Sequence, residues 1–197
     1  MSSDDVSWTK LPLGADVVQL LLPHRRPFLL VDRIDGIVLG EQPMLRARKW
    51  ISANEPVLEG HFPGFTLWPG VYTIEGLGQT TNLLTLLRAL VAGARAEGVA
   101  VEKLFAALRA IDRGARGAPR QPTAEQQRLF DAIGAPRNRI GYAGAIDVKL
   151  IEPVFAGCVL EYRVALTREV GNVQHHEVEA RVDDRPVARG SITSATP

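Results

Sequence analysis

The sequence has a single cysteine, no long hydrophobic run and almost no net charge, and each of these shortages excludes a class of protein. Cys158 alone cannot form an intramolecular disulfide or a zinc site built from cysteines, and we expect it to be a half-buried strand residue. No apolar run is long enough to cross a bilayer, and residues 1–10 lack the pattern of a signal peptide. A formal net charge of +1 gives no basic excess for nucleic acid. We therefore expect a cytoplasmic protein without a membrane or nucleic-acid partner.

The rest of the composition is that of an ordinary globular chain. It has 197 residues, 46% of them hydrophobic, which is enough for one well-packed domain. Apolar periodicity predicts helices at 16–22, from 69–70 to about 87, and at 101–111. Alternating patterns predict strands at 34–39, 44–51, 159–167, 173–182 and 186–193, with strand and turn in 142–157. A long apolar helix among such strands predicts an α+β fold, with an antiparallel sheet wrapped around the helix.

A Gly/Pro-rich turn followed by an apolar helix stands out in EGHFPGFTLWPGVYTIEGLGQ, residues 59–79. His61 lies in the turn, where glycines and a proline restrict the backbone. Glu75 falls near the first turn of the helix that the Pro-Gly pair at 69–70 opens, and Gln79 lies four residues later on the same face. The residues alone allow two interpretations. They are either a base and an acid held by rigid backbone, or a turn histidine and a charge near a positive helix end.

The other histidines do not form a pattern typical of a metal site. His24 precedes an apolar strand and neighbours a proline, which is typical of a turn anchor, and we interpret it and Asp32 as structural. His175 and His176 are adjacent on a predicted strand and point to opposite faces, so they cannot bind one metal ion together. We expect His175 to be solvated and His176 to be packed.

Several segments together resemble the bacterial 3-hydroxyacyl-acyl-carrier-protein dehydratases of fatty-acid synthesis. The matching segments are LPHRRPFLLVDR at 22–33, NEP at 54–56, GHFPG at 60–64, PG at 69–70, Glu75, Gln79 and 142–157. The resemblance implies a hotdog fold, with one domain over 1–197 and an inserted segment at 88–140. It also implies a homodimer or a trimer of dimers, with active sites at the interface between paired subunits.

The resemblance further implies roles for single residues. His61 would take the proton α to the thioester carbonyl, and Glu75 of the partner subunit would protonate or orient the departing 3-hydroxyl. The Gly70 N–H, at the helix start, would polarise the thioester carbonyl. Gln79 would hold the Glu75 carboxyl in place. No cofactor and no metal are expected, because the phosphopantetheine arm arrives on the acyl carrier protein, which is the expected partner.

By the resemblance, Phe65, Leu67, Trp68 and Tyr72 would lie around the acyl channel, and Phe62 and Pro69 are further expected substrate-binding residues. Trp68 is bulky where the resembling enzymes commonly have methionine, so we expect an altered chain pocket. A role in polyketide or other secondary lipid synthesis is therefore open beside fatty-acid elongation. A glutamate at position 75, where isomerising relatives carry aspartate, argues against isomerase activity.

Two other functions stay open from the sequence. The hotdog fold also hosts acyl-CoA thioesterases, although their usual motifs differ from GHFPG at 60–64. A non-catalytic subunit that binds acyl carriers, or that partners an active homologue, is the third interpretation. The presence of both His61 and Glu75 argues against it.

The segment 88–140 is the main departure from the resembling enzymes, which have a shorter connection there. Its ten basic and five acidic residues give it a charge of +5, while the rest of the chain carries −4. After the helix at 101–111, an Arg/Gly/Pro-rich linker at 113–122 leads to a capping box at 123–126 that predicts a second helix.

The basic charge of this segment has two interpretations. Two basic positions of the resembling enzymes are lost here, at Ile151 and Glu152. The insertion could replace them as a docking surface for the acidic carrier protein, or its charges could merely solvate two helices. The densest candidates for docking are Arg109, Arg113, Arg116 and Arg120.

Overall fold

The computed structural model describes residues 6–112, 123–124, 127–128, 131 and 142–195. The strands in this part of the chain are β1 (Thr9–Leu13), β2 (Arg33–Val38), β3 (Met44–Ile51), β4 (Tyr142–Leu150), β5 (Cys158–Val170), β6 (Val173–Val182) and β7 (Arg185–Ala195). The helices are α1 (Ala15–Leu21), the short 3₁₀ helix η1 (Pro56–Glu59), α2 (Gly70–Ala96) and α3 (Val101–Ile111).

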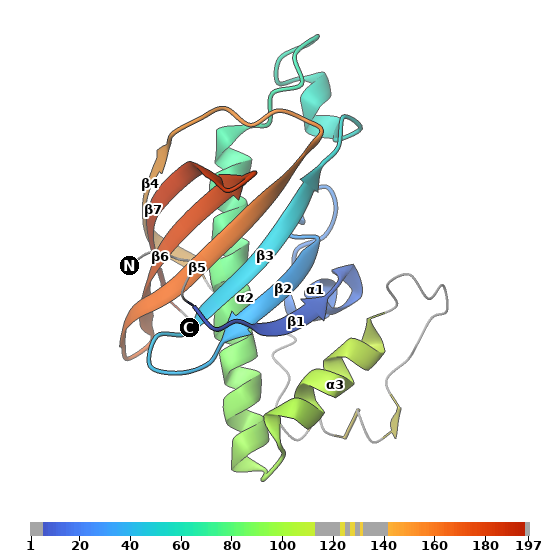
Figure 1. Ribbon diagram of the computed structural model, residues 1–197, viewed down its shortest axis with the longest axis vertical. Helices are drawn as coiled ribbons and strands as arrows, with labels where there is room; N and C mark the ends of the chain where they lie inside the picture. Colours follow the sequence, from blue (N-terminus) through green and yellow to red (C-terminus); the bar gives the residue numbers. More distant parts are fainter. Residues whose placement is uncertain (1–5, 113–122, 125–126, 129–130, 132–141, 196–197) are drawn as a thin grey trace.

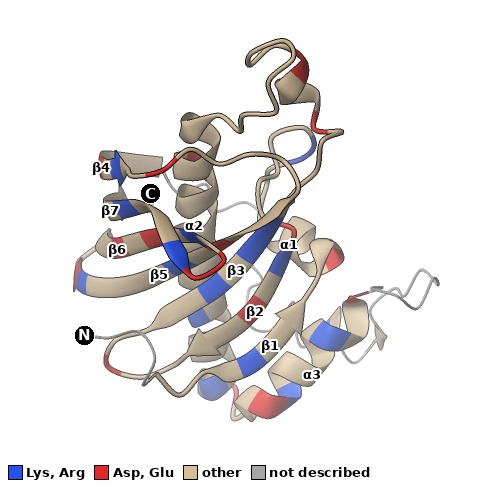
Figure 2. Cartoon of the chain, turned by 45° about the horizontal axis from the view of Figure 1, so that its top comes forward, with Lys and Arg blue, Asp and Glu red and all other residues tan. Residues whose placement is uncertain are grey.

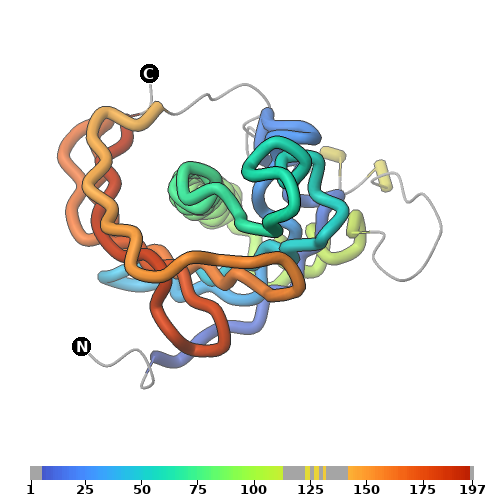
Figure 3. The backbone as a smooth tube through the Cα atoms, turned by 90° about the horizontal axis from the view of Figure 1, so that it is seen from above, coloured from blue at the N-terminus to red at the C-terminus, as the bar shows by residue number. Residues whose placement is uncertain are grey.

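The strands form one antiparallel sheet in the spatial order β1-β2-β3-β5-β6-β7-β4. The sheet curves around α2, which lies on its concave side (Figure 1), and the view along the helix shows the sheet on several sides of it (Figure 3). This arrangement is a hotdog fold, and it confirms the predicted α+β class.

Strand β1 is the strand that the sequence analysis did not predict. It contains Pro12, and proline is poorly compatible with a central strand because it cannot donate a ladder hydrogen bond. β1 lies at one edge of the sheet, beside β2, where proline is tolerated. The predicted strands at 44–51 and 173–182 coincide with β3 and β6.

Helix α2 begins at the predicted place but runs further than predicted. Pro69 is its N-cap, and Leu77, Leu83, Leu84 and Leu87 are buried against the sheet. The buried face continues through Leu90, Val91 and Ala94, so the helix ends only at Ala96, close to Gly98 with its positive φ of 66°. Residues 88–96, which the sequence analysis assigned to the inserted segment, therefore continue the central helix.

Helix α3 follows α2 within the inserted segment, and its bounds match the predicted helix. The helix contacts α1, α2 and β1, and its buried residues are Leu104, Phe105, Ala107, Leu108 and Ile111. Just after the helix, an Asp112 carboxylate oxygen accepts a hydrogen bond of 2.8 Å from the Gly14 N–H. α3 therefore covers one end of the domain. The linker 113–122 and most of the second predicted helix lie outside the described residues.

The outer side of the sheet carries paired charges. Figure 2 shows basic and acidic residues distributed over β2, β3, β5 and β6. The ion pairs that join them include Arg33–Asp35, Arg48–Asp35, Arg163–Glu161 and Arg181–Glu179. Lys49 points the other way, into the core, and is only 6% exposed. Its Nζ lies 3.3 Å from an Asp32 oxygen and 2.6 Å from a Glu55 oxygen.

Several smaller sequence expectations can be compared with the described residues. Cys158 is a free, half-buried strand cysteine, and His176 is buried while His175 is partly exposed. Within the described ranges, no helix combines the length and hydropathy needed to span a bilayer. The same ranges contain no group of three or more His, Cys, Asp or Glu side chains that could hold a metal ion.

Candidate active site

His61 lies in a loop that two sets of backbone hydrogen bonds hold in place. Its N–H donates to the Val57 carbonyl at 3.1 Å, which ties it to η1. After the turn, the Trp68 N–H donates to the Val154 carbonyl at 2.8 Å and the Ala156 N–H donates to the Thr66 carbonyl at 2.9 Å. The loop is therefore attached to the connection between β4 and β5, which restricts the position of the His61 ring.

One hydrogen bond fixes the tautomer of His61. Its Nδ1 lies 3.1 Å from the Leu67 carbonyl oxygen. Because a carbonyl oxygen can only accept, Nδ1 must carry the proton. In the neutral ring, Nε2 then has the basic lone pair. Among the described residues, Nε2 has no hydrogen-bond partner, so it is available to a substrate.

The His61 ring lines a cavity of about 340 Å³. The other lining residues include Leu67, Trp68, Gly70, Thr73, Leu150, Ile151, Glu152 and Val154. Gly70 is the first residue of α2, and the first N–H groups of a helix have no intrahelical acceptor. A Cβ on Gly70 would lie 2.4 Å from Cδ1 of Leu150, so a glycine allows β4 to approach the helix start. The cavity is thus lined by apolar side chains, by His61 and by Gly70, the first residue of a helix.

The side-chain amide of Gln79 contacts the Glu75 carboxyl, and its other hydrogen bonds fix which amide atom is oxygen and which is nitrogen. Its Oε1 accepts a hydrogen bond of 2.8 Å from the Leu30 N–H, and its Nε2 donates to the Phe28 carbonyl at 2.8 Å. A backbone N–H cannot accept and a carbonyl cannot donate, so the amide orientation is fixed. The second Nε2 hydrogen is directed to Oε1 of Glu75, at 2.9 Å. The expected contact between Gln79 and Glu75 is therefore present.

His24 also contacts Glu75, which the sequence analysis did not anticipate. His24 Nε2 lies 3.6 Å from Glu75 Oε1, and both residues line a cavity of about 160 Å³ that also includes Gly78, Gln79, Thr81 and Tyr142. The interpretation of His24 as only a turn anchor is therefore incomplete. Asp32 has the expected structural role, since its carboxylate accepts a hydrogen bond of 2.8 Å from the Trp50 N–H.

His61 and Glu75 line different cavities of the same subunit. No hydrogen bond or ion pair joins them in the described part of the chain. A base and an acid that act on one substrate must both reach it, and these two reach different cavities. One subunit alone therefore does not combine them in a single cavity.

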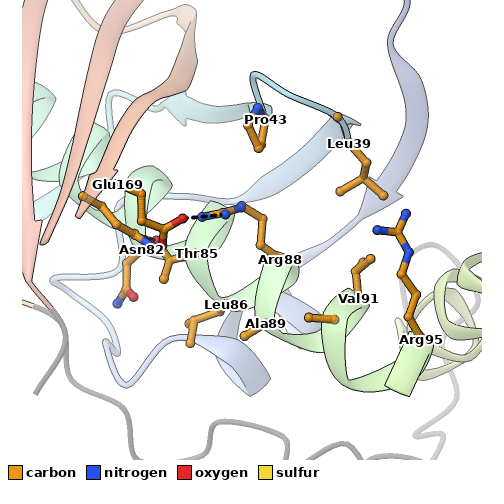
Figure 4. A pocket seen from close by; sticks show the side chains of 13 residues that line it. Leu39, Pro43, Asn82, Thr85, Leu86, Arg88, Ala89, Val91, Arg95 and Glu169 are labelled. Atoms are coloured by element: carbon orange, nitrogen blue, oxygen red, sulfur yellow. Dashed lines mark hydrogen bonds and ion pairs between the residues drawn. The ribbon is translucent and has the colours of Figure 1, made fainter. Parts of the chain in front are cut away.

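A larger cavity of about 420 Å³ adjoins the Glu75 cavity along α2, and Asn82 and Thr85 line both. Its apolar lining residues come from two elements, with Leu39 and Pro43 on the connection between β2 and β3 and Leu86 and Val91 on α2 (Figure 4). Arg88 of α2 forms a 2.8 Å ion pair with Glu169 of β5, and both residues also line this cavity. The hydrogen bond from Arg88 lowers the pKa of the Glu169 carboxyl, so this pair stays ionised and its charges cancel.

The aromatic residues expected in the acyl channel are divided between the interior and the surface. Trp68 is only 2% exposed and lines the His61 cavity, and Tyr72 packs edge-on against it with 5.3 Å between the ring centroids. Pro69 is buried at the helix start. Phe62 and Phe65 are 57% and 56% exposed, so they lie at the surface of the single subunit.

Comparison with known proteins identifies the family of this chain. The FabA-like domain family matches residues 22–107, which include His61, Glu75 and Gln79. The 3-hydroxyacyl-[acyl-carrier-protein] dehydratase FabZ of Polynucleobacter necessarius subsp. necessarius is 47% identical over 186 residues, covering 93% of this chain and 94% of that protein. The protein of the same name from Campylobacter fetus subsp. fetus is 31% identical over 176 residues, covering 89% and 91%. The chain belongs to the 3-hydroxyacyl-acyl-carrier-protein dehydratase family.

A solved structure agrees with this dehydratase family at the level of the fold. It is the dehydratase heterocomplex ApeI:P from Xenorhabdus doucetiae, with a TM-score of 0.55, 15% sequence identity and coverage of 91% of this chain and 90% of that chain. The resemblance inferred from the motifs around His61 and Glu75 is therefore confirmed for the family and for the hotdog fold.

Of the four arginines expected to dock the carrier protein, Arg109 lies within the described residues. Arg109 is exposed on α3, and its guanidinium donates to the Lys10 carbonyl at 3.0 Å, so it helps to attach α3 to β1. Arg113, Arg116 and Arg120 lie outside the described residues. Ile151 and Glu152, at the lost basic positions, both line the His61 cavity.

Proposed function

We propose that the chain is a 3-hydroxyacyl-[acyl-carrier-protein] dehydratase, which removes water from a 3-hydroxyacyl thioester and leaves the trans-2-enoyl thioester. The observation that carries the proposal is the tautomer of His61, because it leaves the basic Nε2 without a protein partner in a cavity that Gly70, the first residue of α2, also lines. Membership of the family supports the same reaction. The phosphopantetheine arm enters with the carrier protein, so it belongs to the substrate.

The proposed reaction uses three groups. His61 Nε2 takes the proton from C2 of the substrate, and the electron pair moves toward the thioester carbonyl, whose oxygen gains negative charge. The Gly70 N–H donates to this oxygen and stabilises it. The C3–O bond then breaks, and the departing oxygen takes a proton from the Glu75 carboxyl and leaves as water. His61 ends protonated and Glu75 ends as a carboxylate, so a proton must return through solvent before the next turnover.

An edge strand supports a homodimer in which the two cavities meet. β4 is the last strand of the sheet, and its outer edge has no partner in the described part of the chain. Tyr142, Ile146 and Leu150 on this strand are 59%, 53% and 49% exposed. An exposed apolar edge of this kind favours pairing with another strand. A second copy of the chain, paired through β4, would cover it.

The same pairing would bring His61 of one subunit to Glu75 of the other. Tyr142, at the start of β4, lines the Glu75 cavity, whereas Leu150, at its end, lines the His61 cavity. Two β4 strands that pair antiparallel around Ile146 place the start of one beside the end of the other. Each Glu75 cavity would then adjoin the partner's His61 cavity, and the dimer would contain two shared sites.

Mass spectrometry of a 3-hydroxyacyl carrier protein incubated with the purified protein tests the proposed reaction. We expect loss of one water from the acyl group, and the reverse hydration when the trans-2-enoyl carrier protein is supplied. His61→Ala serves as the inactive control. Loss of the whole acyl group would indicate a thioesterase, and an unchanged carrier would indicate a non-catalytic subunit, so either result would overturn the proposal.

A further inference from the structure

The two carboxyl oxygens of Glu75 differ in their contacts with the protein. Oε1 accepts the hydrogen bond from Gln79 Nε2 at 2.9 Å and lies 3.6 Å from His24 Nε2. Oε2 has no hydrogen bond or ion pair to any described residue. Because the Glu75 side chain is 33% exposed, Oε2 remains available to a ligand in the cavity while Oε1 faces two side chains of the protein.

The surroundings of the His24 ring indicate which of its two nitrogens carries the proton, and that nitrogen is Nε2. Nδ1 is buried and has no hydrogen-bond partner among the described residues. A buried, unpaired N–H is costly, since the donor loses its water without replacement. The neutral ring therefore carries its proton on Nε2, which is the nitrogen directed to Glu75. At 3.6 Å this contact is longer than a hydrogen bond, and such contacts in active sites often shorten when substrate binds.

The turn that carries His24 is held by hydrogen bonds to its backbone carbonyls, and within this segment the His24 ring contacts only the ring of Phe28, with 6.2 Å between the ring centroids. The Arg25 guanidinium donates to the Leu22 carbonyl at 2.8 Å and to the His24 carbonyl at 2.7 Å. The next segment is attached to Gln79 through Phe28 and Leu30. A structural role for the turn therefore does not require an imidazole at position 24, and the contact with Glu75 remains to be explained.

We propose that His24 is a positioning residue for Glu75. Its Nε2–H and the Gln79 amide together hold Oε1, so that the carboxyl rotates little and Oε2 stays directed toward the 3-hydroxyl of the substrate. This inference rests on the dehydratase function proposed above. His24 acts through Glu75 and does not contact the reacting atoms, so its loss lowers turnover more than it lowers substrate binding.

Two substitutions of His24 separate positioning from packing. His24→Phe keeps a ring but removes the donor, and we expect kcat to fall about 10-fold or more, with KM changed little. His24→Gln keeps an N–H donor near the position of Nε2, and we expect it to recover a clear part of the lost kcat. His175→Phe, on β6, is the matched control for loss of a partly exposed histidine and should leave kcat unchanged. Thermal unfolding shows whether each variant is folded, and His24→Leu replaces His24→Phe if the latter does not fold.

A double-mutant cycle tests whether His24 works through Glu75. In the Glu75→Gln background, we expect His24→Phe to cause little further loss of kcat, because the group that it positions is gone. An unchanged kcat in folded His24→Phe, the same fold loss in both backgrounds, or no recovery in His24→Gln would each overturn the inference. The activity of the wild-type protein distinguishes a failure of the His24 role from a failure of the proposed function. If it does not dehydrate the substrate, the proposed function fails, whereas an active wild type with insensitive His24 variants refutes only the role of His24.

Discussion

Gly76 of α2 lies directly against the hydroxyl of Tyr162 on β5. A Cβ built on Gly76 would be 2.2 Å from Tyr162 Oη and 2.4 Å from Cζ. Tyr162 is fully buried, so its ring has little room to move away. The absence of a side chain at position 76 therefore allows α2 to approach the sheet one residue after Glu75.

The first prediction concerns this contact. Gly76→Ala should lower the free energy of unfolding by about 1–3 kcal/mol, the usual cost of overpacking a core. Gly78→Ala is the matched control, because a Cβ there meets nothing within 4 Å, and alanine is favoured over glycine in a helix by about 1 kcal/mol. Chemical denaturation of both variants provides the measurement. Equal stability of the two variants would show that Tyr162 does not limit the approach of the helix.

Local signals made much of this fold predictable from the sequence. The Pro-Gly pair at 69–70 predicts the start of α2, and strand-like patterns predict β3 and β6, because these features depend on neighbouring residues. The i, i+4 spacing likewise predicts that Gln79 reaches Glu75. The strand β1 was missed, since its pairing with β2 depends on residues distant in sequence.

The contacts that the sequence did not reveal are long-range. His24 and Glu75 meet only because the turn before β2 packs on α2, and no periodicity connects them. Lys49 occupies a core-facing position whose charge is compensated by Asp32 and Glu55. The end of α2 was misjudged for another reason. The apolar pattern continues past Leu87, and the glycine that follows the true end at Ala96 is Gly98, which was not used as the stop signal.

The second prediction concerns pH and stability. Burial lowers the pKa of His176 to about 4, from the ordinary value of 6.5. The unfolded chain therefore binds a proton at this position between about pH 6.5 and 4, whereas the folded protein does not, so stability falls as pH falls through this range. The full effect is on the order of 3 kcal/mol. Denaturation midpoints from pH 7 to 4 measure it.

The variant His176→Leu should lose less stability than the wild type over the same pH range. His175→Leu is the control, and it should retain the dependence of the wild type because the buried ring is still present. A His176→Leu protein with an unchanged pH dependence would assign the acid sensitivity to other groups.

The third prediction concerns chain-length preference. Trp68 lines the His61 cavity and is almost fully buried, so Trp68→Met should enlarge the space for the acyl chain. We expect a shift of kcat/KM toward longer or bulkier 3-hydroxyacyl substrates, at roughly 1 kcal/mol per added methylene. Competition among substrates of graded length measures this shift. Trp50→Met is a suitable control, because Trp50 is 42% exposed on β3 and outside this cavity, and the same shift in both variants would refute the assignment.

The fourth prediction concerns the basic insertion as a docking surface for the carrier protein. Replacing Arg113, Arg116 and Arg120 by glutamate should raise KM for the carrier-bound substrate in a salt-dependent manner, because the carrier protein is acidic. A small pantetheine thioester should be processed as before. Equal losses on both substrates would indicate that the insertion supports the fold or the cavity, and the docking role would then be abandoned.

The central claim is that His61 of one subunit acts with Glu75 of the partner subunit, and differently tagged His61→Ala and Glu75→Gln subunits test it most directly. Each homodimer should turn over about 10²-fold more slowly than the wild type, the usual scale of acid-base catalysis. A purified dimer with one subunit of each kind should regain up to half of the wild-type activity, because one of its two shared sites then has both residues intact. Mixed dimers no more active than the two homodimers would contradict the claim, since both residues would then act within one chain.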